Sequence, residues 1–235
     1  MAAPEDCRTR DAPAAAQLDC VGLARGARIE LVERLWGIGE VRVQLADPSR
    51  TLERFTTPHH VEAAEVSPDG LLAFVWHHGE RPPLRLSIYD LREHTRLVEF
   101  TPGFGGDLRF TPRGKLIHTW GCGSNCHSFA IYDRYGRTVL NGGASGLEVS
   151  PGRGSLLAFP SFMDAQEPVT LYDLETGKPS ITWSSPDNDS FVVDSIASGR
   201  SGMVEVNLTM LAGWSGRLTL ARSPSGQMCA SITRI

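Results

Sequence analysis

The sequence lacks clustered positive charge and long apolar runs, and each absence argues against a class of function. Its 235 residues include 23 Lys and Arg against 27 Asp and Glu, a formal net charge of −4, with no block of like charges. Nucleic acids and anionic membranes attract concentrated Lys and Arg, so we expect neither as a partner. A membrane-spanning helix needs ~18 uninterrupted apolar residues. Gly and Pro interrupt nearly every apolar run here, so we expect no membrane span.

Complete catalytic and cofactor motifs are also lacking. The segment 213–217, Gly-Trp-Ser-Gly-Arg, misses the final Gly of a nucleophile elbow. The segment 103–106, Gly-Phe-Gly-Gly, misses the spacing of a phosphate-binding loop. No His-Glu-x-x-His occurs, and three residues separate Cys122 from Cys126 where haem attachment requires two. We expect no cofactor; the sequence favours a protein that is not an enzyme but leaves that question open.

The N-terminus lacks the basic and apolar regions of a signal peptide. Its Ala-rich start is instead typical of residues just past a cleavage site. We therefore hypothesise a periplasmic or secreted protein from which a signal peptide has been removed.

Cysteine is scarce, and none of the five residues belongs to the paired C-x-x-C halves of a zinc ribbon. Cys122 and Cys126 bracket a short loop that could bring their Cβ atoms to the roughly 3.5–4.5 Å of a disulfide. We predict this disulfide and prefer a second one between Cys7 and Cys20, which leaves Cys229. Reduced thiols in a cytosolic protein are the alternative.

Two landmarks repeat along the chain. A turn motif, usually with Pro and Gly, follows apolar segments at 67–70, 111–114 and 150–154, with a weaker copy at 198–202. A second landmark, most often Tyr-Asp, falls at positions 46, 89, 132, 172 and 221, which are 43, 43, 40 and 49 residues apart. This spacing is close to the ~40–45 residues of a four-stranded propeller blade.

Each repeat has the pattern strand, turn, strand, loop, strand, turn, strand, and helical periodicity is absent. In the second repeat, strands are expected at 61–66, 71–76, 84–89 and 96–100. We predict an all-β fold: a single small β-propeller of about five four-stranded blades over residues 18–235, after an N-terminal tail of residues 1–17. The last repeat contains its own outer strand, 228–235, so we expect the ring to close without strand exchange.

Three segments carry a family resemblance: 67–74 (SPDGLLAF), 88–91 (IYDL) and 172–177 (YDLETG). They resemble the TolB-type, WD-like propeller repeat. The resemblance covers roughly residues 61–183, and the terminal repeats depart from the pattern. It implies a propeller scaffold of the kind found mostly in exported bacterial proteins, which bind proteins or peptides at one face without catalysis.

Aromatic residues recur where a propeller blade joins its second and third strands. In a propeller, these loops share one face with the loops between blades. The recurring residues are Trp36, Trp76, Trp120, Phe162 and Trp214. With His77 and His78 at the rim, they form the predicted binding surface. Packing of the aromatic rings between blades is the alternative interpretation.

Histidines and carboxylates also gather on these loops. The histidines are His59, His60, His77, His78 and His127, and the carboxylates are Asp107, Asp164, Glu167, Asp187 and Asp189. Such groups can bind a divalent metal or transfer protons. Solvated loop residues are the simpler interpretation, and we predict neither a catalytic residue nor a metal site.

The leading functional hypothesis is a non-catalytic exported propeller that binds a protein partner through its loop face. An inhibitor or immunity-type protein of the bacterial envelope is its concrete form. The alternatives are a propeller hydrolase or lyase that uses the loop histidines and carboxylates, and a module that binds carbohydrate or peptide through the tryptophans.

Overall fold

Alternating or fully apolar segments between short Gly-containing turns favour β-strands, and strands and turns make up almost all of the described chain. The computed structural model describes residues 8–10, 15–20, 27–33, 39–44, 53–56, 60–67, 69–77, 84–123, 126–150, 154–160, 168–186, 189–198 and 203–235. No helix in these ranges is long and apolar enough to cross a membrane. The all-β prediction is confirmed.

The chain divides into two compact units. The first comprises Met1–Trp120 and Phe129–Asn141, and the second comprises Gly121–Ser128 and Gly142–Ile235. The described residues form one five-stranded sheet and four four-stranded sheets, each with its strands in chain order. Such meanders of four antiparallel strands are consistent with propeller blades.

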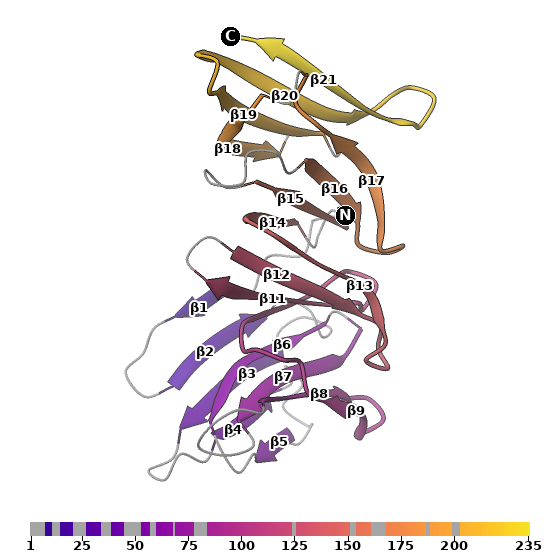
Figure 1. Ribbon diagram of the computed structural model, residues 1–235. Helices are drawn as coiled ribbons and strands as arrows, with labels where there is room; N and C mark the ends of the chain where they lie inside the picture. The colour runs from indigo at the N-terminus through magenta and orange to yellow at the C-terminus, as the bar shows by residue number, and fades with distance from the viewer. Residues whose placement is uncertain are drawn as a thin grey trace. The chain divides into compact units, whose positions relative to one another are not determined.

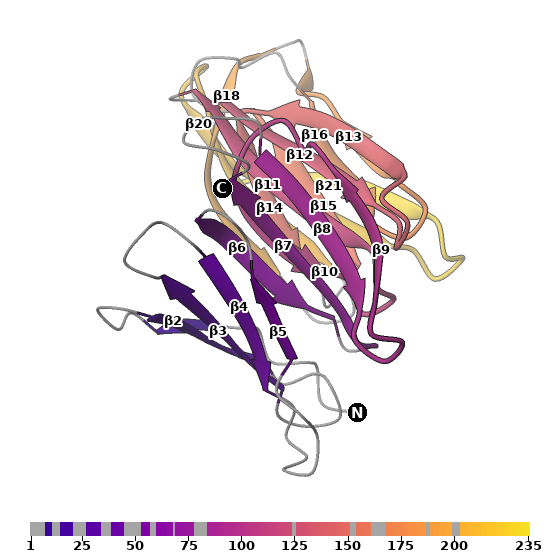
Figure 2. The same cartoon turned by 90° about the horizontal axis from the view of Figure 1, so that it is seen from below.

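The first unit contains two complete sheets and most of a third. The five-stranded sheet consists of β1 (Arg8–Arg10), β2 (Ala15–Cys20), β3 (Ala27–Glu33), β4 (Gly39–Gln44) and β5 (Glu53–Thr56). The next sheet consists of β6 (Val61–Val66), β7 (Leu71–His77), β8 (Leu84–Asp90) and β9 (Thr95–Phe100), side by side in Figure 2. The third consists of β10 (Asp107–Phe110), β11 (Leu116–Gly123), β12 (Cys126–Tyr132) and β13 (Thr138–Ala144).

The second unit contains two further meanders, visible in Figure 1. One consists of β14 (Gly146–Ser150), β15 (Ser155–Phe159), β16 (Val169–Asp173) and β17 (Lys178–Trp183). The other consists of β18 (Phe191–Ser198), β19 (Val204–Met210), β20 (Trp214–Arg222) and β21 (Met228–Arg234). Because β21 pairs with β20, the last sheet has its own outer strand, as the sequence predicted.

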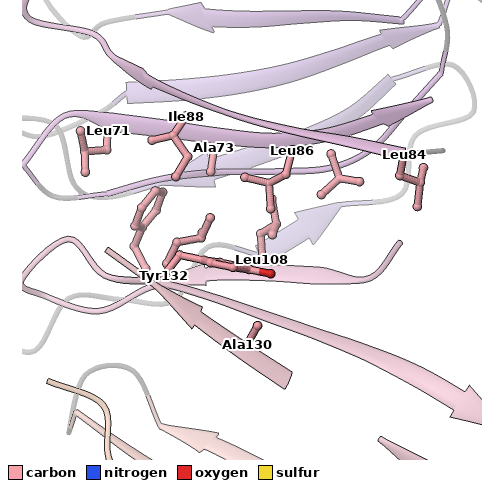
Figure 3. Close-up of a cluster of buried hydrophobic side chains, with 11 residues drawn as sticks. Leu71, Ala73, Leu84, Leu86, Ile88, Leu108, Ala130 and Tyr132 are labelled. Atoms are coloured by element: carbon pink, nitrogen blue, oxygen red, sulfur yellow. The ribbon is translucent and has the colours of Figure 1, made fainter. Parts of the chain in front are cut away.

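Strand β7 organises the interior of the first unit because both of its faces are buried. Leu72, Phe74 and Trp76 face one cluster, which includes Val41 of β4. Leu71, Ala73 and Val75 alternate to the other face, in a second cluster with residues of β8, β10, β11 and β12. Figure 3 shows side chains of two facing sheets meeting in that second cluster. Burying each large apolar side chain contributes roughly 1.5–3 kcal/mol, so β7 stabilises both layers at once.

The second unit has a separate core. Buried side chains of β15 and β16 pack with those of β18, β19 and β20, among them Leu171, Phe191 and Val206. The edge of the Trp183 ring meets Phe191 with ring centroids 5.3 Å apart. Each unit therefore buries apolar side chains between neighbouring sheets.

The predicted number of four-stranded blades, about five, is wrong. Only four of the described sheets have four strands, because β1 adds a fifth strand to the first sheet through pairing of Arg8–Arg10 with Gln17–Asp19. Part of the expected tail, residues 8–10 and 15–17, therefore consists of strand residues. The division of the chain into 1–17 and 18–235 and the closure of a ring stay predictions.

The predicted landmarks mark real turns and strand ends. In the turns after β6 and β10, Gly70 and Gly114 adopt positive φ angles of 94° and 77°. Their backbone N–H groups donate to the carbonyl oxygens of Ser67 and Thr111. The Tyr-Asp landmarks end or nearly end β8, β12 and β16, the third strand of each sheet.

Candidate functional site

The candidate site lies in the first unit, at the end of two sheets where β6 and β10 begin and β7, β9 and β11 end. We call this region the loop end; it comprises the described residues 60–62, 76–77, 84–85, 100–107 and 119–120. The N–H group of His77 donates to the carbonyl oxygen of His60 over 2.9 Å, which ties the end of β7 to the start of β6. Figure 2 shows these two strands side by side.

A β-bulge places a carboxylate beside an imidazole. Val61 pairs with Trp76 and Ala63 pairs with Val75, so Glu62 is an extra residue on β6. Bulges bend a strand and redirect side chains. Here the Glu62 Oε1 atom lies 2.8 Å from His77 Nε2, with the two side chains 30% and 26% exposed. The His60 and His77 rings are also neighbours, with centroids 5.8 Å apart.

Trp76 precedes His77 but points into the protein. It is 8% exposed and belongs to the apolar cluster around Phe74 and Val41. Its indole N–H donates to Ser87 Oγ over 3.1 Å, so its polar atom has a partner in the interior. This burial favours the packing interpretation for Trp76, while its place in a binding surface stays a prediction.

The loop between β9 and β10 packs tightly against both neighbouring elements. A Cβ atom on Gly105 would overlap the Glu62 carboxylate, and one on Gly106 would overlap the backbone oxygen of Thr119. The Glu62 side chain could move aside, but the Thr119 backbone could not, so only glycine fits at position 106. Phe104 projects from this loop and is 59% exposed.

Trp120 and His118 lie on the same face of β11, two residues apart. Their rings pack with centroids 4.8 Å apart, and Trp120 is half-buried. His118 is fully buried, and neither of its ring nitrogens has a hydrogen-bond partner among the described residues. Burial lowers the pKa of His118 to about 4, which keeps the imidazole neutral at pH 7.

The remaining predicted site residues divide between the second unit and the undescribed positions. Trp214 belongs to the second unit, is half-buried, and lies under the Arg234 guanidinium, 5.2 Å from the ring centroid. Trp36, Phe162 and His78 fall outside the described residues, as do His59, Asp164, Glu167 and Asp187. Of the predicted residues, the structure brings together His60 and His77.

Cys122 and Cys126 are joined by a disulfide, with Cα atoms 5.0 Å apart. It closes the β11–β12 hairpin, and Ser128 Oγ donates to Cys122 Sγ over 3.3 Å. Cys229 is free and exposed. Cys7 and the side chain of Cys20 fall outside the described residues, so their pairing stays a prediction.

Sequence reasoning missed Glu62 and Phe104 at the loop end. Among the described residues, no group of three or more His, Cys, Asp and Glu side chains is arranged to hold a metal ion. The arrangement offers an aromatic ring, a carboxylate–imidazole pair and a partly exposed tryptophan. These groups are suited to contacts with another molecule.

The fold and the loop end define an all-β protein of repeated four-stranded antiparallel sheets with an irregular surface at one end of the first unit. No family model and no curated protein matches the chain. Solved structures resemble it at low identity. A functionally unknown protein from Desulfotomaculum acetoxidans DSM 771 is 10% identical, with a TM-score of 0.46 over 87% of this chain and 65% of that one.

Two further structures show the same level of similarity. An uncharacterised protein from Listeria monocytogenes EGD-e is 10% identical, with a TM-score of 0.44 over 98% of this chain and 70% of that one. The Dos1 propeller is 8% identical, with a TM-score of 0.43 over 94% of this chain and 68% of that one. The chain thus spans 65–70% of the length of these three structures.

Proposed function

We propose that the protein is a non-catalytic, exported β-propeller of the TolB type that binds a protein partner through the loop end of its first unit. An inhibitor or immunity-type role in the bacterial envelope is the concrete form of this proposal. The repeated four-stranded meanders and the repeat motifs support the propeller assignment. The Cys122–Cys126 disulfide supports export, because disulfides persist in oxidising compartments.

One observation carries the binding proposal: the loop end holds exposed groups in defined positions that do not serve the core. The bulge at Glu62 interrupts regular pairing, and the 101–106 loop holds Phe104 in solvent. Irregular segments on a rigid scaffold are where recognition residues concentrate.

The test is capture of the partner from the envelope fraction of the native source, followed by titration of the purified partner. A Glu62→Ala/His77→Ala variant removes the exposed pair, and a Tyr135→Ala/Arg137→Ala variant alters the β12–β13 turn at the opposite end of the sheet. We expect affinity to fall ~10-fold or more for the first variant only. Equal affinity of wild type and the first variant would refute binding at the loop end.

The Glu62–His77 contact supports one alternative, an enzyme that uses His77 as a general base. A carboxylate next to an imidazole orients the ring for proton transfer. Turnover that disappears in His77→Ala, while partner binding is unchanged, would replace the binding function with this one. The carbohydrate-binding alternative has weaker support, because Trp76 is buried and Trp120 and Trp214 are half-buried.

A further inference from the structure

The 101–106 loop holds an aromatic ring in solvent and is fixed by Gly106, where the Cβ of any other residue would overlap backbone. Gly105 lies against the Glu62 carboxylate and Gly106 lies against the backbone of Thr119. Pro102, at the other side of Phe104, is buried and anchors the loop. A large apolar side chain that is 59% exposed in so constrained a loop is available for contact with another molecule.

Two other exposed or half-buried aromatic rings of the chain are each faced by an arginine. The Arg134 guanidinium lies 5.8 Å from the Tyr135 ring centroid, and that of Arg234 lies 5.2 Å from Trp214. Among the described residues, no Lys or Arg faces the ring of Phe104 in this way. Guanidinium and ammonium groups are attracted to the face of an aromatic ring within ≈6 Å, so the exposed ring of Phe104 is suited to receive a cation from another molecule.

Two carboxylates are available near Phe104 to a cation over its ring. The Glu62 carboxylate, which also contacts His77, lies against Gly105, and Asp107 is exposed three positions along the chain. Arg85 of β8 donates from Nη1 to Thr101 Oγ1 over 3.3 Å and so contacts the start of the loop. Arg109 is exposed on β10, beyond Asp107.

We infer that Phe104 is the anchor of the partner-binding surface and that it receives an Arg or Lys side chain from a basic segment of the protein partner. The cation would lie over the phenyl ring, with Glu62 and Asp107 as its carboxylate neighbours. This inference rests on the proposed function, since it names the chemistry of the partner at the loop end. The formal net charge of −4 is complementary to such a segment.

The test uses a phage-displayed library of short random peptides, selected on the purified protein, and fluorescence anisotropy of the enriched peptides after synthesis. We expect enrichment of Arg and Lys, and binding that weakens as salt concentration rises. The dissociation constant should increase ~30-fold in Phe104→Ala, as for the loss of an anchor residue. Asp107→Asn should weaken binding less. The matched control is Tyr135→Ala, which removes a ring that is 56% exposed at the opposite end of the sheet and should leave binding unchanged.

Selected peptides without excess Arg and Lys, absence of any binding peptide, or equal affinity for wild type and Phe104→Ala would each overturn the inference. Because Phe104 is exposed, the variant should fold, and its thermal melting curve checks this. The proposed function has a separate readout in the titration of the captured partner with Glu62→Ala/His77→Ala. Loss of that binding, combined with peptides that ignore Phe104, would refute the basic anchor and leave the proposed function standing.

Discussion

Burial separates neighbouring residues of the loop end into those that build the fold and those available to a partner. Trp76 is 8% exposed and donates to Ser87, whereas His77 reaches the surface beside Glu62. His118 is buried without a hydrogen-bond partner among the described residues, while Trp120 lies half-buried on top of it. Mutations of adjacent residues should therefore have different consequences.

Trp76→Ala should destabilise the protein strongly. Removing a buried Trp leaves a cavity and costs ~3–5 kcal/mol, whereas His77→Ala removes a partly exposed side chain and should cost under ~1 kcal/mol. Urea denaturation of both variants measures the difference. A folded Trp76→Ala protein of wild-type stability, with partner binding lost, would instead make Trp76 a recognition residue.

His118 should make stability depend on pH in the acidic range. Burial holds its folded-state pKa at about 4, below the ordinary value of 6.5, so the unfolded chain takes up a proton where the native protein does not. This contribution is fully present above pH 6.5 and is lost as the pH falls towards 4, by ~3 kcal/mol in total.

Melting temperatures measured from neutral pH down to pH 4 test this prediction. His118→Leu should flatten the curve, and His127→Gln, a change at an exposed histidine, should preserve the wild-type slope. An unchanged slope in His118→Leu would show that another group causes the acid sensitivity.

The residues that sequence reasoning missed depend on local geometry that a residue pattern does not encode. Glu62 meets His77 only because an extra residue interrupts the register between Val61 and Ala63. In the sequence, nothing distinguishes Phe104 from apolar residues of the core. Its exposure follows from the position of its loop, which packs against Glu62 and Thr119. By contrast, His77 and His60 could be predicted, since strand ends and loops follow from the repeat.

Turns after the third strand of a sheet rely on the recurring aspartate. Asp90 Oδ1 accepts hydrogen bonds from the backbone N–H groups of Arg92 and Glu93, and Asp133 and Asp173 accept equivalent bonds. Burial alone would raise the pKa of Asp173. Hydrogen bonds from Thr176 and Glu175 and the charge of Arg222 outweigh it and hold that pKa below its ordinary value. The Tyr-Asp landmark therefore marks a turn-stabilising carboxylate.

Asp90 should contribute more to stability than Asp133. Besides its turn bonds, Asp90 lies 2.9 Å from Arg134, which comes from the next repeat, and its side chain is 11% exposed. Asp90→Ala should cost ~2 kcal/mol, because it removes the turn hydrogen bonds and also an ion pair whose arginine side chain is 44% exposed. Asp133→Ala removes only turn hydrogen bonds and should cost ~1 kcal/mol. Chemical denaturation compares them, and equal losses would refute a role for the ion pair between repeats.

Gly106→Ala should destabilise the loop between β9 and β10. Its Cβ would overlap the backbone oxygen of Thr119, which cannot move without disturbing β11, so we expect a loss of ~1–3 kcal/mol. Gly121→Ala is the control, because nothing lies within 4 Å of its added Cβ. Thermal unfolding of both variants provides the comparison, and a Gly106→Ala protein as stable as Gly121→Ala would contradict the close packing.

The strands of the second repeat were predictable to within about one residue, because apolar runs and Pro-Gly turns there agree. The first repeat differs because Arg8–Arg10 joins the sheet through backbone pairing with Gln17–Asp19. Polar residues in such an edge strand give no apolar pattern to detect.

For the whole molecule, the account combines a repeated scaffold with a local recognition surface. Each unit has a core of its own between neighbouring sheets. The irregular features that we assign to binding, the bulge at Glu62 and the loop carrying Phe104, lie together in the first unit. Partner binding should therefore be sensitive to substitutions at the loop end and much less sensitive to substitutions at the opposite end of the same strands.

Site-specific photo-crosslinking in the native source tests this claim most directly. A photoreactive residue at Asp107, where β10 begins, probes the loop end, and one at Arg113, in the β10–β11 turn, probes the opposite end of the same strands; both positions are exposed. We predict a covalent adduct with one protein partner from position 107 and none from position 113. Adduct formation from position 113 alone, or equally from both positions, would contradict recognition at the loop end.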